Sequence, residues 1–344
     1  MRTERCDTQP AMPTTMHDRP LVTMVLVAYC QENIVAEAIQ GCFDQTYQPL
    51  EIIVSDDCSQ DGTWTTIKDL VAKYQGPHKV VTNRNPKNLG IVRHVNKVLQ
   101  MASGTLIVAC AGDDISMPER TERLVKAWMT DSSTIKSISS ACQKITWEGE
   151  VIGTVSAFRS LSHAAEPSAM QVIRNRAYCL GATMMWHRDV IDHFGEIPQT
   201  SHAEDGPLLL RATLIGRACY VDEPLIKHRV GGVSNPTGTT IIDDYFQHSG
   251  EICKKRMQTM SAMITDLSRF TSHDVRNLLK VGRRRLKLLE FENELNNLSL
   301  VERRASISIA IWKTLNTGQI TYILKSLIYA FPGAYLSYRR RRYL

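Results

Sequence analysis

The sequence lacks any long apolar run, and this absence limits the classes of protein that it can encode. A helix that spans a bilayer needs roughly 18 or more consecutive apolar residues, and no stretch of the chain approaches that length. The first twenty residues carry charged side chains where a secretory signal would have an apolar centre. We therefore expect a cytoplasmic protein.

Cysteine pairs and internal repeats are missing as well. The nine cysteines are an odd number, none belongs to a Cys-x-x-Cys pair, and several lie in apolar segments, so we expect reduced core thiols. Glycine and proline are too few for a collagen-like or low-complexity chain. With 43% hydrophobic and 22% charged residues among 344, the composition is typical of a globular protein with a sizeable catalytic domain and a smaller appendage.

Charge divides the chain into two parts. Residues 241–344 hold 18 Lys and Arg against 9 Asp and Glu, whereas the first 240 residues carry a net charge of −3. Residues 1–19 show no apolar periodicity and are expected to form a flexible leader. The two parts that follow the leader should therefore have different partners.

Short apolar segments rich in Val and Ile alternate with segments of helical periodicity in the first third of the chain. This alternation predicts an α/β fold with a mostly parallel central sheet flanked by helices, in which the carboxyl ends of the strands share one edge. The expected strands are 21–28, 51–54 and 105–111, then 135–141, 151–156, 181–186 and 218–221. Helices are expected at 34–42, 64–74, 91–102, 188–194 and 203–215, and throughout the region beyond residue 240.

Acidic pairs follow two of the expected strands. Asp56 and Asp57 stand at a turn, where carboxylates either cap the next helix or accept a hydrogen bond from the N–H of a nucleotide base. Asp113 and Asp114 follow the small Gly112, and such paired oxygen ligands suit Mg²⁺ or Mn²⁺, although a capping turn also explains them. The sequence thus predicts a crevice for a nucleotide and a metal at the sheet edge.

Four segments occur in the order and spacing of a known family. They are Thr23 to Tyr29, Glu51 to Gly62, Asn88-Leu89-Gly90 with Arg93, and Gly112-Asp113-Asp114. Through them the chain resembles family 2 glycosyltransferases from about Leu21 to Asn235, with later matches at Gly181, Gly195, Glu204-Asp205 and Arg211. The resemblance implies the GT-A nucleotide-diphospho-sugar transferase fold, with a catalytic domain at 20–238 and a basic helical C-terminal region at 239–344.

The resemblance also implies how a nucleotide-sugar donor binds. Tyr29 would stack against the base, Asp57 would contact the base ring, and Arg93 would lie near the nucleotide or diphosphate. Asp56, the first of the paired acids, either contacts the donor or caps the turn.

A divalent metal and a general base complete the implied site. Asp113 and Asp114 fill the family's Asp-x-Asp position, with Asp113 near the donor ribose or sugar and Asp114 binding Mn²⁺ or Mg²⁺. Asp205, the second acid of Glu204-Asp205, matches the family's catalytic base, and transfer would invert the anomeric centre. Without the resemblance, the favoured interpretation is that these two acids only stabilise the start of a helix, at the positive end of its dipole.

One motif departs from the family. Relatives often have Tyr-Arg-x-His after the last core strand, whereas this chain has Lys227-His228-Arg229. His228 and Arg229 are therefore further candidates near the metal or diphosphate, with a purely structural role as the alternative.

The basic C-terminal region contains two apolar stretches, 307–312 and 320–331, followed by Arg339 to Arg342. Amphipathic helices with boundary aromatic residues and a basic cluster suit adsorption to anionic lipid at the inner face of the cytoplasmic membrane. A solvated basic face explains the same residues equally well. Nucleic acid is less favoured, because no motif of interleaved aromatic and basic residues is present.

These observations combine into one functional prediction. It is a metal-dependent, inverting glycosyltransferase that uses a nucleoside-diphosphate sugar, expected to be UDP-linked, and a saccharide or polyprenyl-diphosphate-linked acceptor in cell-surface polysaccharide or O-antigen synthesis. A nucleotidyltransferase would instead need a glycine-rich phosphate loop after the first strand, and residues 28–33 lack one. A non-catalytic carbohydrate-binding protein on the same fold would leave the acids idle.

Overall fold

The computed structural model describes residues 19–156, 166–230, 242–270, 273–317 and 320–331. The chain forms two compact units, one of residues 1–199 and 203–236 and the other of residues 200–202 and 237–344. The expected leader lies almost wholly outside the described residues. The eight cysteines of the described ranges are all free thiols, as expected.

The first unit is built on a nine-stranded sheet with the order β3-β2-β1-β4-β8-β6-β9-β5, and β7 pairs with β6. Its first four strands, β1 (Val22–Ala28), β2 (Leu50–Asp56), β3 (Lys79–Arg84) and β4 (Leu106–Ala111), are parallel to one another. β1 and β2 are buried almost throughout, which explains their uninterrupted apolar runs. The α/β prediction is confirmed in this half of the sheet.

The sequence pattern does not predict β3, which lies at one edge of the sheet. Its residues are half-buried or exposed, so the strand needs no apolar run. Pairing with β2, from Glu51 opposite Lys79 to Asp56 opposite Arg84, holds it in place.

The other half of the sheet is mixed rather than parallel. β8 (Met184–His187) is antiparallel to both β4 and β6 (Ile135–Ile145), β9 (Arg217–Arg229) is parallel to β6, and β5 (Ile115–Ser116) is antiparallel to β9. β7 (Val151–Val155) forms a largely exposed hairpin with the end of β6. Through β5, the end of β9 returns to the turn that follows β4.

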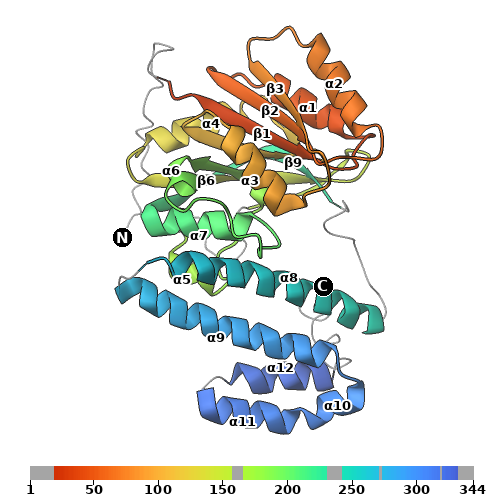
Figure 1. The fold of residues 1–344 in the computed structure, drawn as a ribbon, viewed down its shortest axis with the longest axis vertical. Coiled ribbons are helices and arrows are strands. Elements are labelled where there is room, and N and C mark those ends of the chain that lie inside the picture. Colours follow the sequence, from red (N-terminus) through yellow and green to blue (C-terminus); the bar gives the residue numbers. More distant parts are fainter. Residues whose placement is uncertain (1–18, 157–165, 231–241, 271–272, 318–319, 332–344) are drawn as a thin grey trace. The chain divides into compact units, whose positions relative to one another are not determined.

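Helices pack against this sheet (Figure 1). The main hydrophobic core joins β1, β2 and β4 to the apolar faces of α1, α2 and α4. The helices of the first unit are α1 (Val35–Phe43), α2 (Thr63–Lys73), α3 (Ile91–Met101), α4 (Arg120–Met129), α5 (Ala169–Ile173), α6 (Asp189–Asp192) and α7 (Asp205–Ile215). A short 3-10 turn, η2 (Gly181–Thr183), precedes β8.

The second unit is helical. Its long helices α8 (Ile242–Leu267) and α9 (His273–Asn296) pack against each other. The short helices α10 (Leu300–Ala305), α11 (Ile307–Thr317) and α12 (Thr321–Ala330) share a small core with the end of α9. Over the described residues, no helix combines the length and the apolar character that crossing a membrane requires.

Candidate active site

The carboxyl ends of β1, β2 and β4 meet at one edge of the sheet, as the sequence predicts. The register places Ala28 beside Asp56 and Val27 beside Ala111. Just beyond the strands, the Asp57 N–H donates to the Ala28 carbonyl over 3.0 Å, and the Gly112 N–H donates to the Val27 carbonyl over 3.0 Å. Three of the predicted site segments therefore start from one hydrogen-bonded framework.

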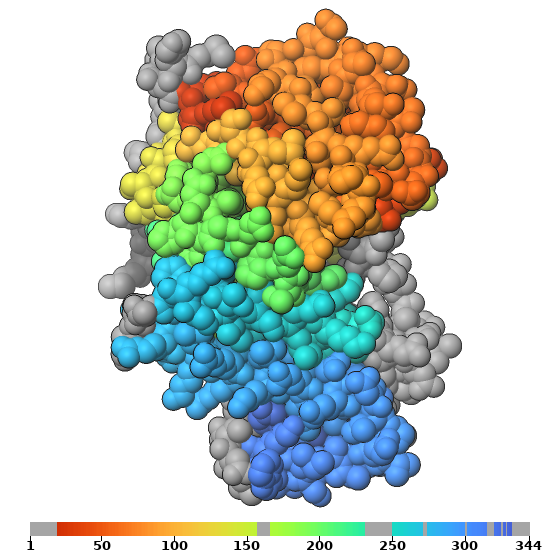
Figure 2. Space-filling view, viewed as in Figure 1, coloured from red at the N-terminus to blue at the C-terminus, as the bar shows by residue number. Residues whose placement is uncertain are grey.

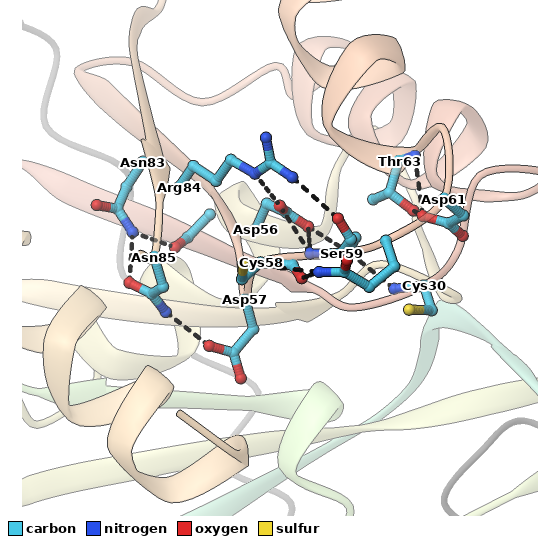
Figure 3. A network of polar contacts seen from close by, with 12 residues as sticks. Cys30, Asp56, Asp57, Cys58, Ser59, Asp61, Thr63, Asn83, Arg84 and Asn85 are labelled. Carbon is cyan, nitrogen blue, oxygen red and sulfur yellow. Dashed lines mark hydrogen bonds and ion pairs between the residues drawn. The ribbon is translucent and has the colours of Figure 1, made fainter. Parts of the chain in front are cut away.

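Asp57 is buried and organises the loop between β3 and α3. One carboxylate oxygen accepts from the Asn85 amide over 2.8 Å and from the Leu89 N–H over 2.9 Å, and the other accepts from the Gly90 N–H over 2.9 Å. A carboxylate has about four acceptor positions, so one remains for a further donor such as a base N–H. The close-up shows Asp57 beside Asn85 (Figure 3).

Asp56 is fully buried and holds the turn after β2. It accepts from the Ser59 N–H over 3.1 Å and from the Ser59 hydroxyl, and it pairs with the Arg84 guanidinium over 3.2 Å (Figure 3). These contacts match the turn-capping alternative for Asp56. They leave Asp57, not Asp56, beside the loop that leads to Arg93.

Tyr29 and Arg93 supply the exposed side chains at this edge. Tyr29 follows β1 directly and is 38% exposed, so part of its side chain is accessible to a ligand. Arg93 lies in the first turn of α3, is exposed, and has no hydrogen bond or ion pair within the described residues. An exposed cation without a partner next to the Asp57 loop is available for an anionic group.

Asp114 connects the turn after β4 to the end of β9. Its carboxylate lies 3.1 Å and 3.2 Å from Nδ1 of His228 and accepts from the Arg229 N–H over 3.0 Å. The hydrogen bond with Asp114 raises the pKa of His228, although burial opposes the shift. The reversed His-Arg order thus still brings a histidine onto the predicted metal-binding acid.

Asp113 is destabilised as an anion. Burial, and then the neighbouring Asp114, raise the pKa of Asp113 to about 6. A divalent cation at this pair would relieve both effects, so the two acids fit such an ion. Within the described residues, no three acidic, histidine or cysteine side chains form a ready-made metal cluster, so ligand oxygens would have to complete the coordination.

Arg229 links the acidic turn to two features that sequence reasoning missed. Its guanidinium donates to the Asp113 carbonyl over 3.2 Å, pairs with Glu37 of α1 over 3.1 Å, and donates to the Trp147 carbonyl. It also lies 5.9 Å from the centre of the Trp147 ring, which is 46% exposed. Only the long-range pairing of β6 with β9 brings Trp147 here, so no local pattern could have found it.

Glu204 and Asp205 lie at the start of α7. Burial, and then the neighbouring Asp205, raise the pKa of Glu204 to about 7, while burial also raises the pKa of Asp205. The Tyr178 hydroxyl hydrogen-bonds Asp205, and a Cβ at Gly181 would collide with the Glu204 carboxylate. Tyr178 contacts the candidate base, a position that its sequence context did not reveal.

A family model described as Glycosyl transferase family 2 matches residues 23–189. The putative glycosyltransferase EpsE of Bacillus subtilis is 34% identical over 110 residues, which cover 32% of this chain and 39% of that protein. Chondroitin synthase of Pasteurella multocida is 24% identical over 214 residues, which cover 62% of this chain and 21% of that protein. The matched regions therefore span well under half of these relatives.

Solved structures with 15% sequence identity share the fold. TarS 1–349 of S. aureus in complex with UDP aligns with a TM-score of 0.56 over 83% of this chain and 78% of that chain. The mannosyltransferase PcManGT of Pyrobaculum calidifontis, in complex with GDP-Man and Mn²⁺, aligns with a TM-score of 0.56 over 92% of this chain and 88% of that chain. The sheet, its ordered edge motifs and the family match agree: residues 23–189 belong to glycosyltransferase family 2, in a chain with the GT-A fold.

Proposed function

We propose that the chain transfers a sugar from a nucleoside-diphosphate donor, with UDP as the expected nucleotide, to a saccharide or polyprenyl-diphosphate-linked acceptor. The observation that carries the proposal is the meeting of Tyr29, Asp57 and the Asp113-Asp114 pair at one sheet edge in a family 2 chain. Solved neighbours in complex with UDP, UDP-GlcNAc and GDP-Man support a nucleotide-sugar donor.

Donor binding would use the exposed and the buried sides of the edge together. Tyr29 stacks on the base, the remaining acceptor position of Asp57 receives a base N–H, and Arg93 pairs with the nucleotide or diphosphate. Three hydrogen bonds hold the Asp57 side chain in place before the nucleotide sugar binds. Binding therefore costs little side-chain entropy at Asp57.

Asp114 would hold Mn²⁺ or Mg²⁺, with Asp113 beside the donor ribose or sugar. Such an ion supplies charge stabilisation to the leaving diphosphate. His228 holds the Asp114 carboxylate in place, and Arg229 fixes the backbone of Asp113. The Mn²⁺ bound to PcManGT supports this part of the proposal.

Asp205 would act as the general base. Its carboxylate accepts the proton of the acceptor hydroxyl while that oxygen bonds to the anomeric carbon and the bond from that carbon to the diphosphate oxygen breaks, which inverts the configuration. Tyr178 orients the carboxylate through its hydroxyl. The raised pKa of Asp205 makes it a stronger base than an exposed aspartate.

The acceptor side would include Trp147. Its half-exposed ring is tied to the acidic turn through Arg229, and flat aromatic faces pack well against sugar rings. A carrier-linked acceptor would place the chain at the cytoplasmic face of a membrane in polysaccharide or O-antigen assembly. Arg339 to Arg342, predicted to bind anionic lipid, lie outside the described residues.

A thermal-shift screen of nucleotide sugars, with Mn²⁺ and with EDTA, tests the proposal. A ligand that binds only the folded state raises the apparent melting temperature, so at least one nucleoside-diphosphate sugar should do so only with metal. Stabilisation by nucleoside triphosphates alone would favour a nucleotidyltransferase. Stabilisation by free saccharides alone would favour a carbohydrate-binding protein.

A further inference from the structure

The short helices of the second unit expose their apolar side chains. Four large apolar residues at helical spacing form one face of α12 and its two cap positions: Ile320 is 64% exposed, Leu324 51%, Leu327 41% and Phe331 46%. Val301 and Ile309, 77% and 53% exposed, extend over α10 and α11. We define the apolar face as these six residues. In Figure 2, the deeper blue spheres belong to the helices that carry this face.

Polar side chains of the same helices point inward instead. Arg303 is buried and donates to the Leu295 and Asn296 carbonyls over 2.9 Å and 3.1 Å. Ser326 is fully buried, and the buried Tyr329 hydroxyl donates to Glu292 over 3.2 Å. A helix in contact with water normally exposes polar rather than apolar side chains, so the apolar face is suited to a non-aqueous neighbour.

Charge indicates which neighbour fits. Residues 300–344 contain eight Lys and Arg and a single acid, Glu302. Five cations on α9 line a shallow cavity of about 320 Å³, and within the described ranges none of them forms an ion pair. They are Arg276, Lys280, Arg283, Arg284 and Lys287. A second copy of the chain would bring two strongly basic segments together, whereas an anionic surface complements them.

We propose that α10–α12 form a docking surface for an anionic lipid bilayer, in which the apolar face enters the boundary between headgroups and acyl chains. Basic side chains of the second unit, including those of α9, would bind headgroup phosphates. Nucleic acid would account for the cations but not for the apolar face. The proposal extends the membrane association suggested by the basic tail and places it on different residues. It also concerns binding without donor, acceptor or metal, so its outcome is independent of transfer.

Flotation of the full chain with vesicles tests the docking surface. Wild type should bind vesicles of phosphatidylcholine with phosphatidylglycerol, and Leu324→Gln/Leu327→Gln should bind them at least 10-fold more weakly. The matched control is Val151→Gln/Ile152→Gln on β7, where the side chains are 56% and 55% exposed, and it should bind as wild type does. Both variants change exposed residues, and their melting temperatures verify folding.

A second variant reports the position of the face directly. Leu324→Trp should retain binding, and brominated lipid should quench the added fluorescence relative to wild type. The proposal is overturned if the double glutamine variant binds anionic vesicles like wild type, because charge alone would then account for binding. Failure of wild type to bind, or loss of a wild-type dimer in the glutamine variant without any change in vesicle binding, also overturns it.

Discussion

Loss of Arg93 should affect donor binding without affecting the fold. Arg93 is exposed and has no partner within the described residues, so Arg93→Ala should leave the melting temperature unchanged. Donor affinity should fall about 10-fold or more, the scale of one hydrogen bond to a charged group. Titration calorimetry with UDP measures this, and Lys97→Ala, exposed one turn further along α3, is the matched control. Equal affinities in the two variants would remove Arg93 from the site.

Asp205→Asn should separate binding from chemistry. Donor affinity should stay near wild type while the rate of transfer falls by about 10²-fold or more, the usual scale for a lost general base. Tyr178→Phe should lower the rate less, because it removes only the hydrogen bond that orients the carboxylate. A normal turnover number for Asp205→Asn would mean that Asp205 only stabilises the start of α7 and is not the base.

Trp147→Ala should raise the acceptor KM and leave donor affinity unchanged, because over the described residues the ring contacts the acidic turn through Arg229 rather than directly. Val151→Ala, on the same exposed hairpin, is the control. Kinetics with both substrates varied would distinguish an effect on the acceptor KM from an effect on donor affinity. A change in donor affinity would contradict the placement of Trp147 on the acceptor side.

Glu204 should make stability depend on pH. Burial and Asp205 raise its pKa to about 7, so the folded protein keeps a proton that the unfolded chain loses near its ordinary pKa of about 4.3. Stability from this group is therefore present at low pH and is lost as pH rises from about 4 to about 7. The melting temperature of Glu204→Gln, compared with wild type, should improve across that window. A constant difference between the two would refute the shifted pKa.

Among single residues, the sequence predicted acids of the candidate site but not the hydrogen bonds that hold them. Asp57 and Asp114 stand out because they directly follow buried strands. That Asp57 is held by Asn85, Leu89 and Gly90, and Asp114 by His228, depends on segments 28 to 114 positions away in the chain. No local pattern encodes such distances.

At the scale of elements, β1, β2 and β4 follow from their apolar runs because these strands are largely buried, and α1, α2 and α3 follow from helical periodicity. The edge strand β3 could not be predicted in this way, because its residues are half-buried or exposed and form no apolar run. The mixed half of the sheet could not be predicted in this way either, because β8 and β9 pair with distant strands. Neighbouring residues in the sequence indicate that a segment forms a strand, but they do not indicate which strand it pairs with.

The loop before α3 offers a test at this scale. Gly90 has φ of 76° and open space around it, so Gly90→Ala should cost about 1 to 3 kcal/mol through backbone strain alone. A backbone that shifts to relieve this strain would move the Gly90 N–H that donates to Asp57, so donor affinity should fall too. Gly149, with φ of 93° in the β6–β7 hairpin, is the control whose replacement should lower stability only. Equal donor affinities in the two variants would contradict the proposed link between this loop and donor binding.

At the scale of the whole molecule, the two-part charge pattern corresponds to two compact units with different chemistry. The first unit holds every acid of the candidate site, at the sheet edge and at the start of α7. The second holds the basic helices with the exposed apolar face. Composition could not predict that the apolar side chains of α12 point outward, since that depends on which face packs against α9.

Release of nucleoside diphosphate from nucleotide sugars, measured with Mn²⁺ and with EDTA, tests the central claim most directly. The control variant is Asp114→Asn, which keeps the shape and the acceptor for the Arg229 N–H but removes the charge. We predict that at least one nucleoside-diphosphate sugar is cleaved by wild type only with metal, and that the variant abolishes cleavage while remaining folded. Cleavage that is unaffected by EDTA and by Asp114→Asn, or no cleavage of any donor, would contradict a metal-dependent transferase.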